Sequence, residues 1–436
     1  MRLTLIKITA VLLAGVLVTA CSSGAGTTDP NEKVTLTFWS WVPNLDKVVA
    51  LWNAANPNIQ VEASNQAQGD ELVTKLLTAA KAGNAPDLAQ AEYQALPTLV
   101  SNDVLADIKG HVGDTKSQFA AGVWNVITLG TDAVYAIPQD IGPMMMYYRA
   151  DEFTRLGLTV PKTWDEYAQT ARTVRQKSPK QFLTTFSSAD PGWFVGLAQQ
   201  AGANWWGING NTWKVSVNDA ATTKLATYWG GLVAEGAIDS KPMFTPEWNA
   251  QLNNGTLLTW PSAVWAPGVL SGNAADTAGK WKVAPLPQWS AGESRTGSWG
   301  GSSTAVTAGS KHADAAAKFA IWLNTSPEAT TALVTQGGIY PAATSAQSGG
   351  ALASAPPFFS NQPDFYQVAK SIAATAVGFT FGPNVNVTYS TYKDAFAKAI
   401  TDHSAFPAAV DKMQTATVDD MKKNGFTVSN LSLIHI

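Results

Sequence analysis

Residues 34–91, VTLTFWSWVPNLDKVVALWNAANPNIQVEASNQAQGDELVTKLLTAAKAGNAPDLAQA, decide the fold class of this chain. Segments in which apolar and polar residues alternate, as in a strand, take turns with segments of helical spacing. In the order strand, helix, strand, helix, strand they cover residues 34–39, 46–53, 59–63, 70–82 and 87–91. Strands that alternate with helices of about 10 to 15 residues predict an α/β fold with a mostly parallel sheet, covered by helices on both faces.

The three predicted strands each end in a cluster of aromatic and polar residues. These clusters are Trp39-Ser40-Trp41, Asn65-Gln66-Ala67-Gln68 and Glu92-Tyr93-Gln94. In parallel α/β sheets, ligands bind at the carboxyl ends of the strands. The three clusters are therefore candidates for parts of one ligand site.

The chain begins with the features of an exported protein. Two basic residues, Arg2 and Lys7, lead into an apolar run at 8–18 that is too short to span a bilayer. The run is followed by Cys21, the only cysteine, and then by small polar residues. This arrangement resembles the lipobox of bacterial lipoproteins, and it predicts a signal peptide at 1–20, then an acylated Cys21 and a flexible linker at 21–32. An ordinary secretory signal peptide with an incidental cysteine is the alternative.

The composition of the 436 residues bounds the remaining possibilities. About 400 residues follow the leader, which is more than one hydrophobic core usually serves, so two lobes are expected. Charged residues make up only 14% and the net charge is -3, so no basic surface for nucleic acid is expected. A single cysteine allows no internal disulfide, and four histidines far apart in the sequence predict no metal site. We expect no cofactor.

Two segments are typical of crossings between lobes. Residues 133–149 run extended and are interrupted by two prolines, and the Gly-rich residues 298–303 offer a place for the chain to return. Two lobes joined by several crossings make a hinge. We predict that lobe 1 consists of residues 33–139 plus 303–343, and that lobe 2 consists of residues 140–302 plus 344–430.

Helical patterns are also clear beyond the first crossing. One helix has a marked start, where Thr163 can cap it and Glu166 can reach back. Further helices are predicted at 220–235, 314–324 and 389–399.

Short motifs that follow one another along the chain resemble a known family. After the lipobox they are FWSW (38–41), GNAPDL (83–88), YAIPQDIGPMMMYYR (135–149), VPKTWDEY (160–167), NGTLLTWPSAVWAPG (254–268), GGSSTAV (300–306) and QGGIYPA (336–342). In this order they resemble family 1 extracellular solute-binding proteins, the sugar-binding lipoproteins of ATP-binding-cassette (ABC) importers, which are similar to maltose-binding protein. The resemblance covers nearly all of the mature chain and implies a type II periplasmic-binding fold, with the ligand between two α/β lobes.

The resemblance also implies a set of ligand-binding residues. A sugar has an apolar face of C–H groups and a rim of hydroxyls, so its binding proteins stack aromatic rings on the face and direct amides and carboxylates at the rim. Trp265 is implied as the main stacking ring, because its spacing from Gly255 matches that in maltose-binding relatives. Asp140 suits bidentate binding of neighbouring hydroxyls. The further implied residues are Trp39, Trp41, Gln66, Gln68 and Tyr93 in lobe 1, Gln139 beside Asp140, Trp193 with Trp205 or Trp206 near Trp265, Trp299, Gly300 and Gly301 at the return crossing, and Tyr389.

Each implied residue also has a purely structural interpretation. A tryptophan is as often part of a core as of a site, and Asp140 could cap a turn beside Pro138. Trp52, Trp229 and Trp322 fall within helical patterns, and we expect them in the core. The three methionines at 144–146 are expected to form a buried strand.

A secreted glycoside hydrolase is the competing interpretation of an aromatic-rich exported chain. Such an enzyme needs two carboxylates that flank the scissile bond. Glu92, Asp140, Glu247 and Asp364 are the candidates, and nothing in the sequence pairs them. The residues 390–393 match the S-x-x-K motif of penicillin-recognising enzymes, but the companion motifs are missing. A peptide-binding or adhesive surface lipoprotein is a third interpretation.

The function expected from the sequence is binding without catalysis. We expect an extracytoplasmic protein, anchored to the cell membrane by a lipid on Cys21, that captures a saccharide between its lobes. By the resemblance its partners are the permease subunits of an ABC importer, and we expect a monomer that binds no nucleic acid. Closure about the hinge would let the second lobe complete contacts that only the closed state makes.

Overall fold

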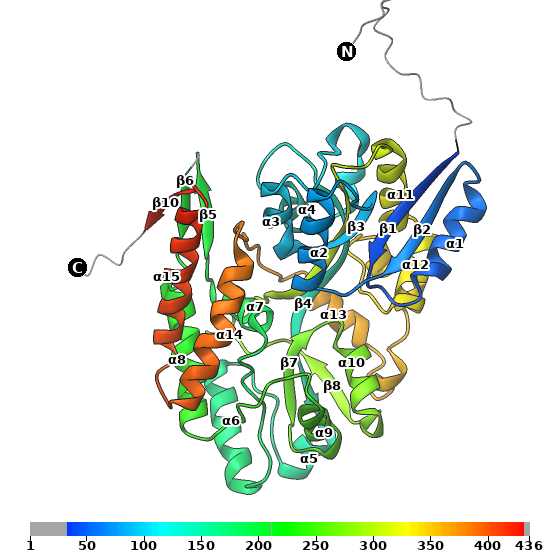
Figure 1. Ribbon diagram of the computed structural model, residues 1–436. Helices are drawn as coiled ribbons and strands as arrows, with labels where there is room; N and C mark the ends of the chain where they lie inside the picture. The colour runs from blue at the N-terminus through cyan, green and yellow to red at the C-terminus, as the bar shows by residue number, and fades with distance from the viewer. Residues whose placement is uncertain (1–32, 211, 431–436) are drawn as a thin grey trace, which may run out of the picture.

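The computed structural model describes residues 33–210 and 212–430. The predicted signal peptide (1–20), the linker with the acylated Cys21 (21–32) and the C-terminal residues 431–436 lie outside the described residues. Figure 1 shows two α/β bodies, one built around β1, β2 and β3 and the other around the far end of β4 with β7 and β8. The names lobe 1 and lobe 2 are kept for the residue sets given above.

The predicted strand–helix alternation of residues 34–91 is confirmed. β1 (Val34–Ser40) pairs in parallel with both β2 (Ile59–Asn65) and β3 (Leu88–Glu92). Between them lie α1 (Leu45–Ala55) and α2 (Asp70–Lys81), within three residues of their expected bounds. The carboxyl ends of the three strands therefore lie at one edge of the sheet, as the sequence predicted.

The sheet is mixed, however, and not mostly parallel. Its strand order is β2-β1-β3-β9-β4-β7, with β8 also paired to β4. β9 (Ser298–Val306) is antiparallel to β3 and to β4 (Ala136–Arg149), which is in turn antiparallel to β7 (Thr259–Ala263) and β8 (Trp281–Ala284). The reason is the path of the chain, since β4 runs out of lobe 1 toward lobe 2 and β9 runs back.

Helices cover the sheet of lobe 1 on both faces. Besides α1 and α2 they are α3 (Leu96–Ser101), α4 (Ala121–Thr128), α11 (Ala313–Thr325) and α12 (Pro327–Gly337). Trp52 of α1 is buried and meets Phe319 of α11 edge to face, with ring centroids 5.4 Å apart. Trp322 is partly buried against the same cluster. The expectation that Trp52 belongs to the core is confirmed.

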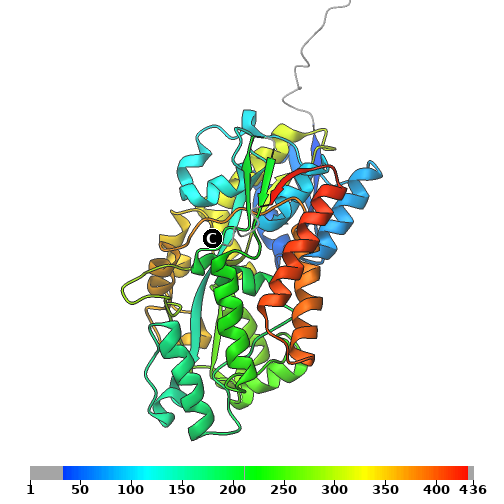
Figure 2. The ribbon, with the colours of Figure 1, turned by 90° about the vertical axis from the view of Figure 1, so that its left-hand side faces the viewer.

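Lobe 2 is mainly helical around the far half of β4. Its helices are α5 (Ala150–Leu156), α6 (Trp164–Lys177), α7 (Pro191–Ala201), α8 (Ala220–Ala234), α9 (Pro246–Asn254), α10 (Ala266–Asn273), α13 (Phe365–Ala373), α14 (Val385–Thr401) and α15 (Pro407–Lys423). Figure 2 shows α14 and α15 side by side, with α8 near them. The three methionines at 144–146 are fully buried, and so is Trp229 of α8, as expected.

A small second sheet stands at one side of lobe 2. It has the order β10-β6-β5 and consists of β5 (Trp206–Asn209), β6 (Thr212–Val215) and β10 (Thr427–Asn430). The side chain of Ile208 in the edge strand β5 is exposed.

The predicted start of α6 is confirmed with one change of partner. The Thr163 hydroxyl accepts a hydrogen bond from the backbone N–H of Glu166 at 3.2 Å. The Glu166 carboxylate reaches back as expected, but it accepts from the backbone N–H of Lys162, at 2.6 Å, one residue before the cap.

Three segments connect the lobes. β4 has irregular pairing with β9 between Pro138 and Asp140 and again between Ile141 and Pro143. Ile141 donates its backbone N–H to the carbonyl of Tyr340 at 3.1 Å, so the segment near 340 lies beside the same point. One hydrophobic cluster takes its buried residues from positions 36–137 and 305–343, and a second takes them from 144–286, Tyr340 and 352–421. The lobe boundaries and the hinge stay predictions.

Glycines permit close backbone contacts where α7 meets β9. A Cβ on Gly297 would lie 1.9 Å from the carbonyl oxygen of Gly196, and a Cβ on Gly196 would lie 2.3 Å from the sulfur of Met144. Distances this short leave no room for a side chain at either position. Helix and strand are therefore in direct backbone contact at this point.

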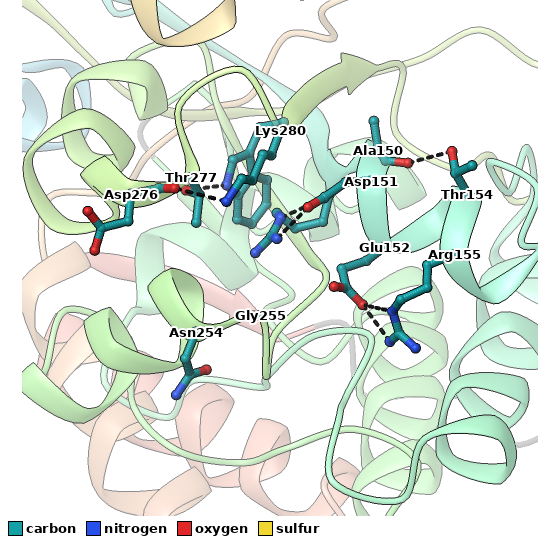
Figure 3. A network of polar contacts seen from close by, with 12 residues as sticks. Ala150, Asp151, Glu152, Thr154, Arg155, Asn254, Gly255, Asp276, Thr277 and Lys280 are labelled. Atoms are coloured by element: carbon teal, nitrogen blue, oxygen red, sulfur yellow. Dashed lines mark hydrogen bonds and ion pairs between the residues drawn. The ribbon is translucent and has the colours of Figure 1, made fainter.

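Ion pairs at the far end of β4 join it to α5. The Arg149 guanidinium, which is almost fully buried, donates to both carboxylate oxygens of Asp151 at 2.8 and 2.6 Å. Figure 3 shows the neighbouring pair of Glu152 and Arg155, which are 2.6 Å apart, above the turn at Gly255. Gln181 donates to both the Glu152 carboxylate (3.0 Å) and the Gly255 carbonyl (2.7 Å), so the network holds this turn in place.

Candidate functional site

Three aromatic rings with accessible surface gather on the side of lobe 2 that adjoins the crossings. Trp265 occupies the position before the first residue of α10, just after β7, and Trp299 lies at the start of β9. Their ring centroids are 4.8 Å apart in an edge-to-face arrangement, and the Trp265 indole N–H donates to the Trp299 carbonyl at 2.9 Å. The ring centroids of Phe244 and Trp299 are 6.0 Å apart, and Phe244 is 44% exposed. We call Phe244, Trp265 and Trp299 the aromatic group.

Two glycines follow Trp299 because the backbone there takes conformations that other residues avoid. Gly300 and Gly301 have φ angles of 77° and 101°. A Cβ on Gly300 would lie 3.5 Å from the Trp265 indole nitrogen, and one on Gly301 would lie 2.8 Å from the ring of Tyr93. The return crossing therefore brings lobe 1, through Tyr93, close to the aromatic group.

Tyr93 and Asp140 lie next to each other, and the Asp140 carboxylate is hydrogen-bonded to another residue of the protein. The Tyr93 hydroxyl donates to the Asp140 carbonyl at 2.9 Å. Both Asp140 carboxylate oxygens accept from Ser302, one from its backbone N–H at 2.6 Å and one from its hydroxyl at 3.1 Å. Burial raises the pKa of Asp140 to about 6, against the lowering effect of these hydrogen bonds. Asp140 thus joins β9 to β4 through both of its carboxylate oxygens, which are the same two oxygens that the expected bidentate contact with a ligand would use.

A second carboxylate, Glu92, lies at the carboxyl end of β3. Burial, with smaller contributions from the charges of Asp70 and Asp140, raises its pKa to about 7. One carboxylate oxygen accepts from the Gln94 side chain at 2.6 Å. Burial, Glu92 and Asp70 together raise the pKa of Tyr389, which places this α14 residue of lobe 2 opposite the strand end of lobe 1.

The lobes also touch directly just before the start of α14. The Thr98 hydroxyl in α3 donates to the carbonyl of Pro383, just before α14, at 2.9 Å. Residues from both lobes therefore surround the region between Glu92 and the aromatic group. We call this region the interlobe site.

Trp39 and Gln66 form a separate patch at the ends of β1 and β2. The Lys75 ammonium lies 4.5 Å from the centre of the Trp39 ring and also donates to the Gln66 side chain. Gln68 is exposed in the loop that follows β2. Trp41 is partly buried against the core of lobe 1, and its backbone N–H donates to Gln90 at 3.2 Å.

Four of the implied residues are enclosed by the protein. Trp193 is fully buried in α7 and donates its indole N–H to the Pro261 carbonyl at 2.9 Å. Trp205 is fully buried and donates to the Thr222 hydroxyl at 2.8 Å. Trp206 packs on the backbone of Gly382, and Gln139 accepts from Thr304 at 3.1 Å inside lobe 1. The structure places these four side chains in the cores and does not bring them to the aromatic group.

Two residues of the interlobe site, Phe244 and Asp190, were not predicted from the sequence. Phe244 stands in a loop with no periodic pattern, and its φ of 61° is unusual for a bulky side chain. Asp190 precedes α7, whose Gly192 would place a Cβ 2.9 Å from the Trp299 ring. Burial raises the pKa of Asp190 to about 6, although the Ser187 hydroxyl and the charge of Lys393 lower it. The signal available for Asp190 was its place directly before Pro191, at the start of a helix.

The candidate hydrolase carboxylates do not all converge. Glu92 and Asp140 are close enough to influence each other electrostatically. Glu247 instead pairs with Lys241, and Asp364 stands at the start of α13. The serine of the S-x-x-K match, Ser390, is exposed on α14, which is an ordinary helix as expected.

A hollow of about 620 Å³ lies away from all of these residues, on the surface of lobe 2. It is lined by α6 and α8 and by Trp289, over whose ring Lys224 lies at 4.3 Å. None of the implied ligand-binding residues lines this hollow, so it is a separate surface feature.

The described ranges contain neither a metal-site cluster nor a helix that could cross a membrane. Between residues 33 and 430, Asn211 excepted, three or more His, Cys, Asp or Glu side chains nowhere gather as a metal site would require. Over the same stretch we found no helix with the length and apolar character needed to cross a bilayer.

Comparison with known proteins gives a family match over most of the chain. The model of the family described as bacterial extracellular solute-binding protein matches residues 39–331. An arabinooligosaccharide-binding protein of Halalkalibacterium halodurans is 25% identical over 346 residues, which cover 76% of this chain and 75% of that protein.

Solved structures agree with the same assignment. The galacto-N-biose-/lacto-N-biose I-binding protein of an ABC transporter from Bifidobacterium longum, in complex with lacto-N-biose, has a TM-score of 0.83 and 29% identity, over 92% of this chain and all (100%) of that one. An ABC-transporter-associated binding protein of B. animalis subsp. lactis, in complex with β-1,6-galactobiose, has a TM-score of 0.80 and 26% identity, over 91% and 100%. The predicted two-lobed periplasmic-binding fold is thereby confirmed.

Proposed function

Because the chain belongs to the family of bacterial extracellular solute-binding proteins, we propose that it captures a saccharide between its lobes and delivers it to an ABC importer. The observation that carries this proposal is the aromatic group. Phe244, Trp265 and Trp299 lie together and stay partly accessible, and the turn at Gly300 and Gly301 brings Tyr93 of lobe 1 close to them. Rings and polar groups in one place match the apolar face and hydroxyl rim of a sugar.

The ligand that fits best is a saccharide of at least two units. Three rings offer more stacking surface than one pyranose face covers. The proteins that this chain resembles are named for binding arabinooligosaccharides, or hold lacto-N-biose or β-1,6-galactobiose. These relatives support a disaccharide or short oligosaccharide as the ligand class.

We assign the ligand contacts by residue. Trp265 and Trp299 stack on the sugar from lobe 2, with Phe244 beside them and Tyr389 at the opposite end. Tyr93 and Glu92 contact it from lobe 1, while Trp39, Gln66, Gln68 and Trp41 form an outer patch. Gly300 and Gly301 give the backbone room at the return crossing, and closure about the crossings completes these contacts.

The protein is proposed to act by binding, with no chemical step. A retaining glycosidase needs one carboxylate free to act as nucleophile beside a protonated partner. Glu92 has the raised pKa of a general acid, but both oxygens of the nearby Asp140 are bonded to Ser302. These two hydrogen bonds join β4 to β9, which favours a structural role for Asp140 over that of a nucleophile.

A thermal-shift screen of the chain from residue 22 onward tests this function. We expect a saturable rise in melting temperature with lacto-N-biose or arabinooligosaccharides, and recovery of the sugar intact after overnight incubation. A sugar that returns cleaved would establish a hydrolase. No shift with any sugar would redirect the search to peptides and other solutes.

We further propose that the protein works outside the cytoplasmic membrane, as a monomer held by a lipid on Cys21. The apolar leader and the lone cysteine support this anchor. Cys21→Ser should release the protein from membranes into the soluble fraction, as fractionation and immunoblotting would measure, without change in saccharide affinity. Persistent membrane attachment of the variant would contradict the anchor.

A further inference from the structure

One buried serine connects three segments of lobe 2 that meet at the interlobe site. Ser187 is fully buried, at the end of an extended segment that pairs with residues near Asp239. Its hydroxyl donates to the Asp190 carboxylate at 2.5 Å. The same oxygen accepts from the backbone N–H of Met243 at 3.1 Å and from that of Ala189 at 3.3 Å.

The backbone of Ser187 makes a further connection to α14. Its carbonyl accepts from the hydroxyl of Tyr392 at 2.7 Å. Tyr392 lies three residues after Tyr389, so both lie on one face of that helix. One residue thus holds the loop before α7, the loop before α9 and the side of α14.

Each of these segments carries a side chain of the interlobe site. They are Asp190, Phe244 and Tyr389. Phe244 directly follows Met243, and its positive φ costs free energy that its surroundings must offset. The bond from the Met243 N–H to Ser187 fixes the backbone immediately before that strained residue.

We propose that Ser187 is a positioning residue of the saccharide site, which orients the Asp190 carboxylate and the Phe244 loop without touching the ligand. This inference rests on the function proposed above. It also assigns Asp190 as a ligand contact, because only one of its two carboxylate oxygens is held by Ser187.

The chemistry of the hydroxyl explains why a serine is needed here. A hydroxyl has one hydrogen to donate and two lone pairs to accept with, and Ser187 uses all three. An alanine would leave the Met243 N–H unpaired and would free the Asp190 carboxylate. A threonine would keep the three bonds but add a methyl group where no surface is exposed.

The pKa of Asp190 is a quantity that would not change if Ser187 had only a structural role. Burial raises the pKa of Asp190 to about 6, while the charge of Lys393 in α14 and the Ser187 hydroxyl both lower it. The hydroxyl of Tyr392 also lies close to this carboxylate. Removal of the Ser187 hydroxyl should therefore raise the pKa of Asp190. Since the carboxylate form accepts hydrogen bonds from sugar hydroxyls, the loss of affinity toward acid should then begin at a higher pH.

The experiment compares Ser187→Ala and Ser187→Thr with a matched control, Ser262→Ala. Ser262 is also fully buried in lobe 2, but its hydroxyl has no hydrogen-bond partner among residues 33–210 and 212–430. Lacto-N-biose affinity is measured by calorimetry from pH 5 to 8, and the Asp190 carboxyl is titrated by carbon-13 NMR in the ligand-free proteins, with Asp190→Asn identifying its signal.

We expect Ser187→Ala to weaken binding about tenfold and to titrate Asp190 at higher pH, while Ser262→Ala changes neither. Ser187→Thr should keep the wild-type titration. The inference is overturned if Asp190 titrates equally in Ser187→Ala and wild type, or if Ser262→Ala loses as much affinity. If the wild-type protein binds no saccharide, the proposed function fails, and the ligand-free titration still decides whether Ser187 positions Asp190.

Discussion

Trp265 and Trp299 differ from Trp193 and Trp205 in what surrounds them, although all four belong to lobe 2. The first two stand beside each other, Trp265 just after β7 and Trp299 near the start of β9, and both are only partly buried. The other two are fully buried, and their indole N–H groups are satisfied by Pro261 and Thr222. The difference teaches that the packing around a tryptophan, and not its residue type, decides whether it can meet a ligand, since Trp206 begins β5 and is still buried.

The largest effect expected from this comparison is on folding. Trp193→Ala should lower the free energy of unfolding by about 3 to 5 kcal/mol, because it leaves a cavity in a closely packed core. Chemical denaturation measures the loss. An unchanged unfolding midpoint with lost saccharide affinity would instead return Trp193 to the site.

Trp265→Ala should show the opposite pattern. We expect saccharide binding at least tenfold weaker, because the main stacking ring is lost, and a melting temperature of the ligand-free protein that is nearly unchanged. Calorimetry and a thermal melt check the two halves separately. Failure to fold would show that Trp265 belongs with the enclosed tryptophans.

Glu92 extends the contrast between enclosed and accessible side chains to a charged group. Its folded pKa of about 7 lies above the ordinary value of 4.5, so the protonated form favours the folded state. This stabilisation is complete below pH 4.5 and is lost as the pH rises through 7. Because the side chain is partly exposed, we expect wild type to lose roughly 1 to 2 kcal/mol over this window relative to Glu92→Gln.

Denaturant melts at several pH values measure that difference. The control is Glu293→Gln, which removes one carboxylate from an exposed position. A parallel pH dependence in wild type and Glu92→Gln would mean that burial does not raise the pKa of Glu92.

Phe244 gives the smallest expected effect. Phe244→Ala should weaken saccharide binding by about threefold to tenfold, because the ring is 44% exposed at the margin of the aromatic group. The loss should be greater for an oligosaccharide than for a monosaccharide in the same titration. An equal loss for both would place Phe244 beside Trp265 and not at the end of the ligand.

Local patterns predicted the elements of the fold well. The segment 34–91 formed its strands and helices because amphipathic periodicity reports which face of each element is buried. The cap at Thr163 followed from a short-range pattern as well. The antiparallel entry of β9 was missed, since strand pairing between residues about 210 positions apart leaves no local trace.

The candidate site was predicted in part. Tyr93, Trp265, Trp299 and Tyr389 lie around the interlobe site, while Trp193 does not. Its neighbours Phe194, Val195 and Leu197 make α7 apolar on all sides, which is typical of a buried helix and could have excluded it. Phe244 had no such signal, because its exposure depends on a loop conformation that only the folded chain fixes.

The backbone contact between Gly196 and Gly297 has a consequence for how this chain can diverge. Asp190 directly precedes α7, which contains Gly196, and Trp299 lies two residues after Gly297, at the start of β9. The distance between the Asp190 carboxylate and the Trp299 ring therefore depends on the contact between the two glycines, where no side chain fits. Exchange of ring or carboxylate could retune sugar preference one residue at a time, while the frame that separates them stays unchanged. In a saturation mutagenesis library, variation should be rich at 190 and 299 and nearly absent at 196 and 297.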